Sequence, residues 1–294
     1  MTNNNQSIQR TFIIGDEWLF LKIYTGYKTS DTILKSVIKP LTIELLEEKL
    51  IDMWFFIRYN DPEYHLRVRF HIVDLSKYSE IILRFNCLIK SLVLDSLIWK
   101  IQADTYNREI ERYGYKTMLL SEELFFYDST AIVSLIDLFT NHIESNFRWM
   151  IALNMIDSLL NDFKFSIEQK KDLLLILQNN FVKEFGFKNE YRKQLGKKYR
   201  IFKKEIETSI SSDLPIDMIK LIEEKSMKSS KSIEAIIKIQ NYNFNKIEIN
   251  NFLSSHIHMM INRLFRTNQR KYELVLYDFL LMYYSSQIAR LSKK

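Results

Sequence analysis

The sequence is short of several residue types, and each shortage excludes a class of protein. Its 294 residues include one cysteine, Cys87, so neither a disulfide framework nor a thiolate metal cluster can form within the chain. Three prolines and five glycines argue against long linkers and a turn-rich all-β fold. No segment approaches the run of about 18 apolar residues that crosses a bilayer, and the polar N-terminus lacks a signal peptide's apolar core. We therefore expect a cytoplasmic protein without a membrane span.

Signatures of several catalytic classes are missing as well. The chain has no glycine-rich phosphate loop, no HExxH pair, no nucleophile elbow and no carboxylate-rich metal loop. His256 and His258 are two residues apart, so on a helix their side chains diverge and a shared zinc ion is not expected. We expect no metal and no cofactor. The formal net charge of +6 is compatible with an acidic ligand but does not by itself indicate nucleic acid.

Hydrophobic content of 47% with 27% charged residues is typical of a globular protein. Apolar patterning predicts strands in the first third and helices in the rest, with no composition break that requires a domain boundary. We predict an α+β fold, in which N-terminal strands form a sheet packed with a largely helical C-terminal two-thirds. The whole chain, 1–294, is expected to be one domain with a polar tail at 1–10. The predicted strands are Glu17–Tyr24, a hairpin over Trp54–Ile72, and Leu97–Thr105.

Helices are predicted from apolar spacing and from capping residues. Pro40 is expected to split a helical region at Thr29–Lys49 into two pieces, and a helix follows the hairpin at Ser76–Leu92. From Ser121 onward the period is helical. The later helices are predicted from a capping box at Ser166 and Gln169 to about Phe181, from Asn250 or Asn251 to Phe265, and over Gln269–Leu291.

The second strand of the hairpin has an unusual face. Side chains alternate along a strand, so one face is apolar and carries Leu66, Val68, Phe70 and Ile72. The other carries His65, Arg67, Arg69 and His71. Two guanidinium groups two residues apart suit a carboxylate or a phosphate, because each offers paired donors and stays charged. The alternative is a solvent-exposed strand face with incidental basic residues.

Two further clusters could take part in chemistry. Glu109 and Arg112 are three residues apart, so on a helical turn they face the same way and can pair. His258 and Asn262 are one turn apart, so Asn262 could orient an imidazole that transfers protons near neutral pH. A packed or exposed histidine is the commoner explanation for His258. The residues alone indicate an acid/base-competent pocket for anions and go no further.

A basic segment at Lys183–Lys204 holds nine Lys and Arg residues against few acids. A solvated helix face is the commoner explanation for such a segment. The alternative is a contact with an acidic peptide or with RNA.

Five segments in order resemble a known family. They are GDEWLFLKIYTG, WFFIRYNDPEYHLRVRF, TYNREIERYG, SEELFFYDS and HMMINRLF. Together they are similar to the elimination domain of class I lanthipeptide dehydratases, also called the thiopeptide-type bacteriocin biosynthesis domain, over about Gly15 to about Glu273. In that family a glutamylation domain places glutamate from glutamyl-tRNA on Ser or Thr of a precursor peptide. The elimination domain then expels the glutamate and leaves dehydroalanine or dehydrobutyrine.

The resemblance assigns roles to five residues, and a sixth, Asn262, is a candidate for substrate contact. Arg67 and Arg69 match the arginine pair that would hold the glutamyl group and the developing enolate. Glu109 and Arg112 match the Glu and Arg of the PExxRYG motif, with Arg112 completing the anion pocket and Glu109 orienting or relaying. His258 matches the histidine before NRL and would transfer the proton, and Asn262 would contact substrate. The family has Pro where this chain has Arg108, and Gly where it has Tyr115, which puts the local geometry near Arg112 in question.

The resemblance also implies partners and leaves rival functions open. The chain is too short to hold the glutamylation domain, so the implied partners are the precursor peptide, a separate tRNA-dependent glutamylating enzyme and a cyclase, without direct tRNA binding. One rival is a thiopeptide pyridine synthase, which joins two dehydroalanines. The other is a non-catalytic scaffold that binds the precursor peptide through Lys183–Lys204.

Overall fold

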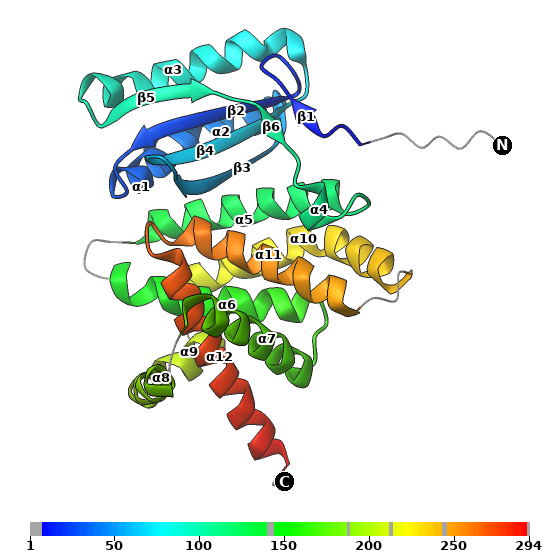
Figure 1. Ribbon diagram of the computed structural model, residues 1–294. Helices are drawn as coiled ribbons and strands as arrows, with labels where there is room; N and C mark the ends of the chain where they lie inside the picture. The colour runs from blue at the N-terminus through cyan, green and yellow to red at the C-terminus, as the bar shows by residue number, and fades with distance from the viewer. Residues whose placement is uncertain (1–7, 140–143, 187–188, 212–213, 243–245, 293–294) are drawn as a thin grey trace, which may run out of the picture. The chain divides into compact units, whose positions relative to one another are not determined.

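The computed structural model describes residues 8–139, 144–186, 189–211, 214–242 and 246–292, and Figure 1 shows its helices and strands. The α+β prediction is confirmed: strands are confined to the first third, and helices make up the rest. By its contacts the chain divides into two compact units, residues 1–134 and 135–294. The single-domain assignment stays a prediction. Among the described residues, no helix combines the length and apolar character needed to cross a bilayer.

Unit 1 contains two antiparallel sheets. The larger has the strand order β3-β4-β2-β5, and the smaller pairs β1 with β6. The strands are β1 (Thr11–Phe12), β2 (Trp18–Thr25), β3 (Ile51–Asn60), β4 (Tyr64–Ile72), β5 (Ile98–Ala103) and β6 (Tyr106–Asn107). The helices and helical turns are α1 (Thr29–Ile33), η1 (Leu34–Ile38), α2 (Lys39–Glu47), η2 (Leu75–Lys77), α3 (Tyr78–Leu94), α4 (Ile110–Tyr113) and α5 (Met118–Leu138), which extends past the division.

One face of the larger sheet packs against helices. Leu66, Val68 and Phe70 of β4 are completely buried, α2 contacts β3, and α3 contacts β5. This confirms the predicted apolar face of the hairpin. On the other face, the Phe55 ring centre lies 5.4 Å from that of Phe125 of α5 and 5.9 Å from that of Tyr106 of β6.

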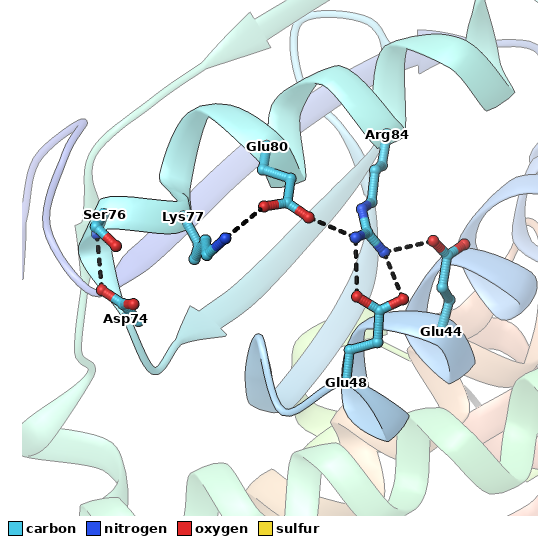
Figure 2. A network of polar contacts seen from close by, with 7 residues as sticks. All are labelled: Glu44, Glu48, Asp74, Ser76, Lys77, Glu80 and Arg84. Atoms are coloured by element: carbon cyan, nitrogen blue, oxygen red, sulfur yellow. Dashed lines mark hydrogen bonds and ion pairs between the residues drawn. The ribbon is translucent and has the colours of Figure 1, made fainter.

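A guanidinium holds α2 and α3 together at the edge of their contact (Figure 2). Arg84 of α3 donates to both carboxylate oxygens of Glu48, at 2.9 and 2.8 Å, and also contacts Glu44 and Glu80. One cation therefore contacts carboxylates of both helices, and α3 buries Ile81, Phe85 and Ile89.

Unit 2 is helical throughout its described residues. Its helices are α6 (Glu144–Asp162), α7 (Ile167–Phe185), α8 (Asn189–Ile201), α9 (Lys203–Ile210), α10 (Ile216–Tyr242), α11 (Lys246–Leu264) and α12 (Gln269–Leu291). α12 packs mainly on α7, and α6 contacts α9, α10, α11 and α12. A buried polar cluster joins three of them: Lys170 of α7 and Tyr284 of α12 both donate to Asp157 Oδ1 of α6, at 2.6 and 2.5 Å.

The helix start at the Ser166 capping box and the limits of the last helix are confirmed, whereas α7 continues past the predicted end at Phe181 to Phe185. The Ser166–Gln169 capping box is present, with contacts of 2.8 and 3.3 Å, and α12 has the predicted limits. Pro40 lies in the first turn of α2, directly after the π-helical turn η1. The cap at Asn250 or Asn251 was wrong: α11 begins at Lys246, so both asparagines lie inside the helix. Of the predicted tail, residues 1–7 lie outside the described residues.

Candidate functional site

Arg67 and Arg69 lie on the face of β4 that the sequence predicts, but that face is not a solvent-exposed one. Arg69 is buried, with 7% of its surface exposed. Its guanidinium carbon lies 4.2 Å from the ring centre of Phe20, 4.8 Å from Tyr106 and 5.1 Å from Phe55. Three rings around one cation favour it electrostatically and restrict its movement. The alternative of a solvent-exposed strand face is therefore wrong for Arg69, and the role of the two arginines stays a prediction.

Arg67 is positioned by a histidine and a tyrosine. Its guanidinium carbon lies 3.5 Å from the Tyr59 ring centre, and its Nε donates to Nε2 of His65 at 3.1 Å. His65 Nδ1 is 2.7 Å from the Glu63 carbonyl oxygen. Burial, assisted by the charge of Arg67, lowers the pKa of His65. A neutral His65 with its proton on Nδ1 satisfies both contacts, because Nε2 then accepts from Arg67.

A lysine and an aspartate form an ion pair beside Arg67. Lys22 lies opposite Arg67 on β2 and forms an ion pair with Asp104. Burial alone would raise the pKa of Asp104, but hydrogen bonds from Lys22 and the Thr105 N–H, with the charge of Arg67, lower it. Asp104 therefore stays ionised and compensates Lys22 at this edge of the site.

A buried ion pair next to Arg69 was missed by the sequence analysis. Arg108 donates to both oxygens of Glu122, from Nε at 2.8 Å and from Nη2 at 2.7 Å. Tyr106 Oη donates to the same carboxylate at 2.7 Å. Arg108, which stands where the family motif has proline, is thus the ion-pair partner of Glu122. The helical period was predicted from Ser121 onward, but α5 already begins at Met118, and the Glu122 side chain within it is fully buried.

Glu109 and Arg112 form the predicted ion pair, at 2.9 Å, with about half of each side chain exposed. Glu109 is the N-cap of the short helix α4 and Arg112 lies in its last turn, and the helix ends at Gly114 with φ +78°. A Cβ there would lie 2.7 Å from Thr117 Oγ1, so this turn requires glycine. The Tyr113 ring centre lies 4.9 Å from that of Phe125, which connects α4 to the aromatic cluster around Arg69.

In unit 2, a carboxylate orients His258. Nδ1 of His258 lies 2.5 Å from Glu273 Oε1, and the other carboxylate oxygen accepts from Arg270 Nη1 at 2.6 Å. Glu273 is almost fully buried, whereas a third of the His258 side chain is exposed. The sequence analysis missed Glu273, because the partner comes from α12 and not from the next turn of α11. The role given to Asn262 stays a prediction.

The second histidine of α11 has a different environment. His256 is buried against Phe252, with ring centres 4.4 Å apart. Burial, with the nearby charges of Arg263 and Lys225, lowers its pKa to about 3, so it is neutral at physiological pH. Among the described residues, no group of three or more His, Cys, Asp or Glu side chains could hold a metal ion.

The candidate residues therefore form two groups, one in each unit of the chain. Arg67, Arg69, Glu109 and Arg112 lie in unit 1, where Phe55, Phe125 and Tyr113 connect them. His258 and Asn262 lie in unit 2. Their use of one substrate remains a prediction from the sequence resemblance.

Comparisons with known proteins give one family for nearly the whole chain. Residues 18–284 match the family described as lantibiotic biosynthesis dehydratase C-term. The chain is 26% identical over 265 residues to the subtilin biosynthesis protein SpaB of Bacillus subtilis, covering 86% of this chain and 24% of SpaB. It is 24% identical over 287 residues to the nisin biosynthesis protein NisB of Lactococcus lactis subsp. lactis, covering 92% and 26%. The chain thus spans about a quarter of the length of these relatives.

Solved structures share the fold. The tRNA-dependent lantibiotic dehydratase MibB from Microbispora sp. 107891 superposes with a TM-score of 0.71 at 17% identity, covering 95% of this chain and 29% of MibB. The pyridine synthase TbtD from thiomuracin biosynthesis gives 0.66 at 10% identity, covering 92% of this chain and all of TbtD. At these identities the likeness concerns the fold alone. The match over residues 18–284 decides the family: the chain belongs to the lantibiotic dehydratase C-terminal family.

Proposed function

We propose that this chain is a peptide-modifying lyase that eliminates glutamate from glutamylated Ser or Thr residues of a precursor peptide. The Cα–H proton is removed, the Cβ–O bond breaks, and glutamate leaves with the bonding electrons as a carboxylate. The product is dehydroalanine from Ser or dehydrobutyrine from Thr. The observation that supports this most is the pair Arg67 and Arg69 on one face of β4, held by aromatic rings in a chain of this family.

The arginines suit the charge that develops in this reaction. As Cα loses its proton, negative charge builds on the neighbouring peptide oxygen, and the leaving glutamate carries a free carboxylate. Cationic donors that are already fixed stabilise such charge at little reorganisation cost. Arg69 is restricted by three rings and Arg67 by Tyr59 and His65, while Arg112 of the exposed pair with Glu109 completes the anion pocket.

His258 is proposed to transfer the proton, with Glu273 as its positioning residue. A carboxylate at Nδ1 fixes which ring nitrogen carries the proton and leaves Nε2 for the substrate. The proposal requires His258 of unit 2 and the arginines of unit 1 to reach the same bound peptide. Glu109 is proposed to orient Arg112, and Asn262 to contact the peptide.

The glutamylation step is proposed to lie outside these 294 residues, on a tRNA-dependent enzyme, because the chain corresponds to only about a quarter of its curated relatives. The further partners in this proposal are the precursor peptide and a cyclase, in a reducing cytoplasm. No metal or cofactor enters the reaction as written.

The test is to supply a peptide carrying one glutamyl ester on Ser and to measure free glutamate together with the mass of the dehydrated product. We expect both from the wild-type chain. His258→Ala should bind the glutamylated peptide and leave it unconverted. Arg10→Ala, at an exposed ion pair with Glu111, serves as the control and should remain active. Dehydration by His258→Ala at the wild-type rate would reject the assignment.

A pyridine synthase is the second candidate, because TbtD has the same fold over its whole length. Such an enzyme joins two dehydroalanines and releases no glutamate from a glutamyl ester. A peptide carrying two dehydroalanines, offered in a parallel reaction, separates the two. Cyclisation of that peptide without glutamate release from the first would favour the synthase.

A further inference from the structure

A stripe of four cations on unit 2 has no partner within the described structure. Lys193, Lys197 and Arg200 of α8 and Lys204 of α9 are all exposed. The spacing of four and three residues places the first three along one side of α8, and Lys204 follows the break at Phe202, the N-cap of α9. None of the four forms an ion pair with a described residue. We call these four residues, together with Ile201 between them, the basic stripe.

Several other exposed cations of this protein form ion pairs. Arg84 of unit 1 contacts three carboxylates (Figure 2), Arg270 contacts Glu184 and Glu273, and Arg290 is 3.2 Å from Glu207. The four cations of the basic stripe, by contrast, form no ion pair with a described residue, and a concentration of exposed positive charge favours an acidic ligand.

The stripe also has an apolar centre. Ile201 is 71% exposed, and Phe202 beside it is 38% exposed. On the inner side of α8, Leu195 and Tyr199 are buried, so Ile201 is not needed for the core of the unit. An exposed large aliphatic side chain within a cationic surface is suited to a ligand that brings both carboxylates and apolar groups.

These features favour a peptide over RNA. Single-stranded nucleic acid is bound through cations and aromatic rings on which bases stack. Ile201 cannot stack a base, and the Phe202 ring already meets Trp149 edge-on, with ring centres 5.7 Å apart. A second copy of this chain that docked stripe to stripe would bring like charges together.

We propose that the basic stripe binds an acidic peptide segment with apolar side chains, with the carboxylates on Lys193, Lys197, Arg200 and Lys204 and an apolar residue on Ile201. The surface is distinct from the proposed catalytic residues, and the binding requires no glutamyl chemistry. Failure of one proposal therefore does not imply failure of the other.

The probe is a fluorescein-labelled synthetic peptide of Glu and Leu, followed by fluorescence anisotropy with the full chain. A Gln and Leu peptide and a single-stranded oligoribonucleotide with the same number of charges are the comparisons. We expect the Glu and Leu peptide to have the highest affinity of the three, and we expect this affinity to fall as the salt concentration rises. Equal or tighter binding of the RNA, or equal binding of the Gln peptide, would overturn the proposal.

Charge-reversal variants test whether the peptide binds at the basic stripe. The triple change Lys197→Glu, Arg200→Glu and Lys204→Glu should lower the affinity for the Glu and Leu peptide by roughly 10-fold or more. The matched control reverses three exposed lysines of α10, Lys220, Lys231 and Lys238, with the same change in net charge, and should retain most of the affinity. Equal losses in both triples would overturn the proposal.

A measurement on the wild-type chain does not depend on whether the variants fold. Reductive methylation with and without the Glu and Leu peptide should show protection of Lys193, Lys197 and Lys204, and none of Lys220 or Lys231. Ile201→Ser should lower the affinity for the Glu and Leu peptide and should not change the affinity for a peptide of Glu alone. Protection confined to the α10 lysines would overturn the proposal.

Discussion

Glu273 of α12 lies 2.5 Å from Nδ1 of His258 on α11 and is almost completely buried. Arg270 holds the other oxygen of the same carboxylate. The exposed part of His258 is thus oriented by a group that substrate cannot displace, an arrangement suited to a histidine that transfers protons.

Replacing Glu273 by Gln should lower the elimination rate on the order of 10²-fold, because the carboxylate no longer fixes the imidazole or balances its charge in the transition state. Single-turnover release of glutamate measures this loss. Glu184→Gln is the matched control, since Glu184 is the exposed partner of the same Arg270, and it should change the rate only slightly. Similar losses in both variants would contradict a specific role for Glu273.

Replacing Arg108 by Met should cost about 3–5 kcal/mol of unfolding free energy, because it leaves the buried Glu122 carboxylate without its compensating charge. The double variant Arg108→Met with Glu122→Leu should lose less unfolding free energy than the single variant Arg108→Met, because no unpaired carboxylate stays buried. Urea unfolding followed by circular dichroism measures both. Arg10→Met breaks the exposed pair with Glu111 and should cost no more than about 1 kcal/mol. An equal loss of unfolding free energy in Arg108→Met and Arg10→Met would contradict a larger stabilising role for the buried Arg108–Glu122 pair.

The two parts of Tyr106 have separable effects. Tyr106→Phe removes the hydroxyl that donates to Glu122 and should cost about 1 kcal/mol of stability, while the ring stays beside Arg69 and elimination changes little. Tyr106→Ala removes the ring as well, so Arg69 loses one wall of its aromatic surroundings, and the rate should fall by roughly 10-fold or more. Steady-state kinetics with thermal melting separates the outcomes. If Phe and Ala reduce the rate equally, the ring does not position Arg69.

His256 predicts a pH dependence of stability. Its pKa is about 3 in the folded chain and near 6.5 when unfolded, so the unfolded state binds the proton first as the pH falls. The stabilising contribution is therefore present above pH 6.5 and is lost as the pH falls from there towards 3, by about 2 kcal/mol at pH 5. His256→Gln should flatten this part of the profile, measured by urea unfolding at several pH values. Identical slopes for the variant and wild type would exclude the buried histidine as the cause.

Local signals carried the predictions that were confirmed. The alternation of Leu66, Val68 and Phe70 with the basic residues follows from strand geometry, and the Ser166 capping box needs only neighbouring residues. The cap at Asn250 or Asn251 was wrong because a capping residue type recurs inside helices and only the actual start of α11 decides which residue caps it. The predicted Glu109–Arg112 pair is likewise local.

By itself, the sequence determined the α+β order, the apolar and basic faces of β4 and, through its motifs, the family, because these depend on spacing along the chain. Only the tertiary structure decided that Arg69 is enclosed by Phe20, Phe55 and Tyr106, that Arg108 pairs with Glu122, and that Glu273 and not a neighbouring residue holds Nδ1 of His258. Each of these contacts joins different elements. Packing of those elements brings the groups together, and burial then makes a charged group require its partner.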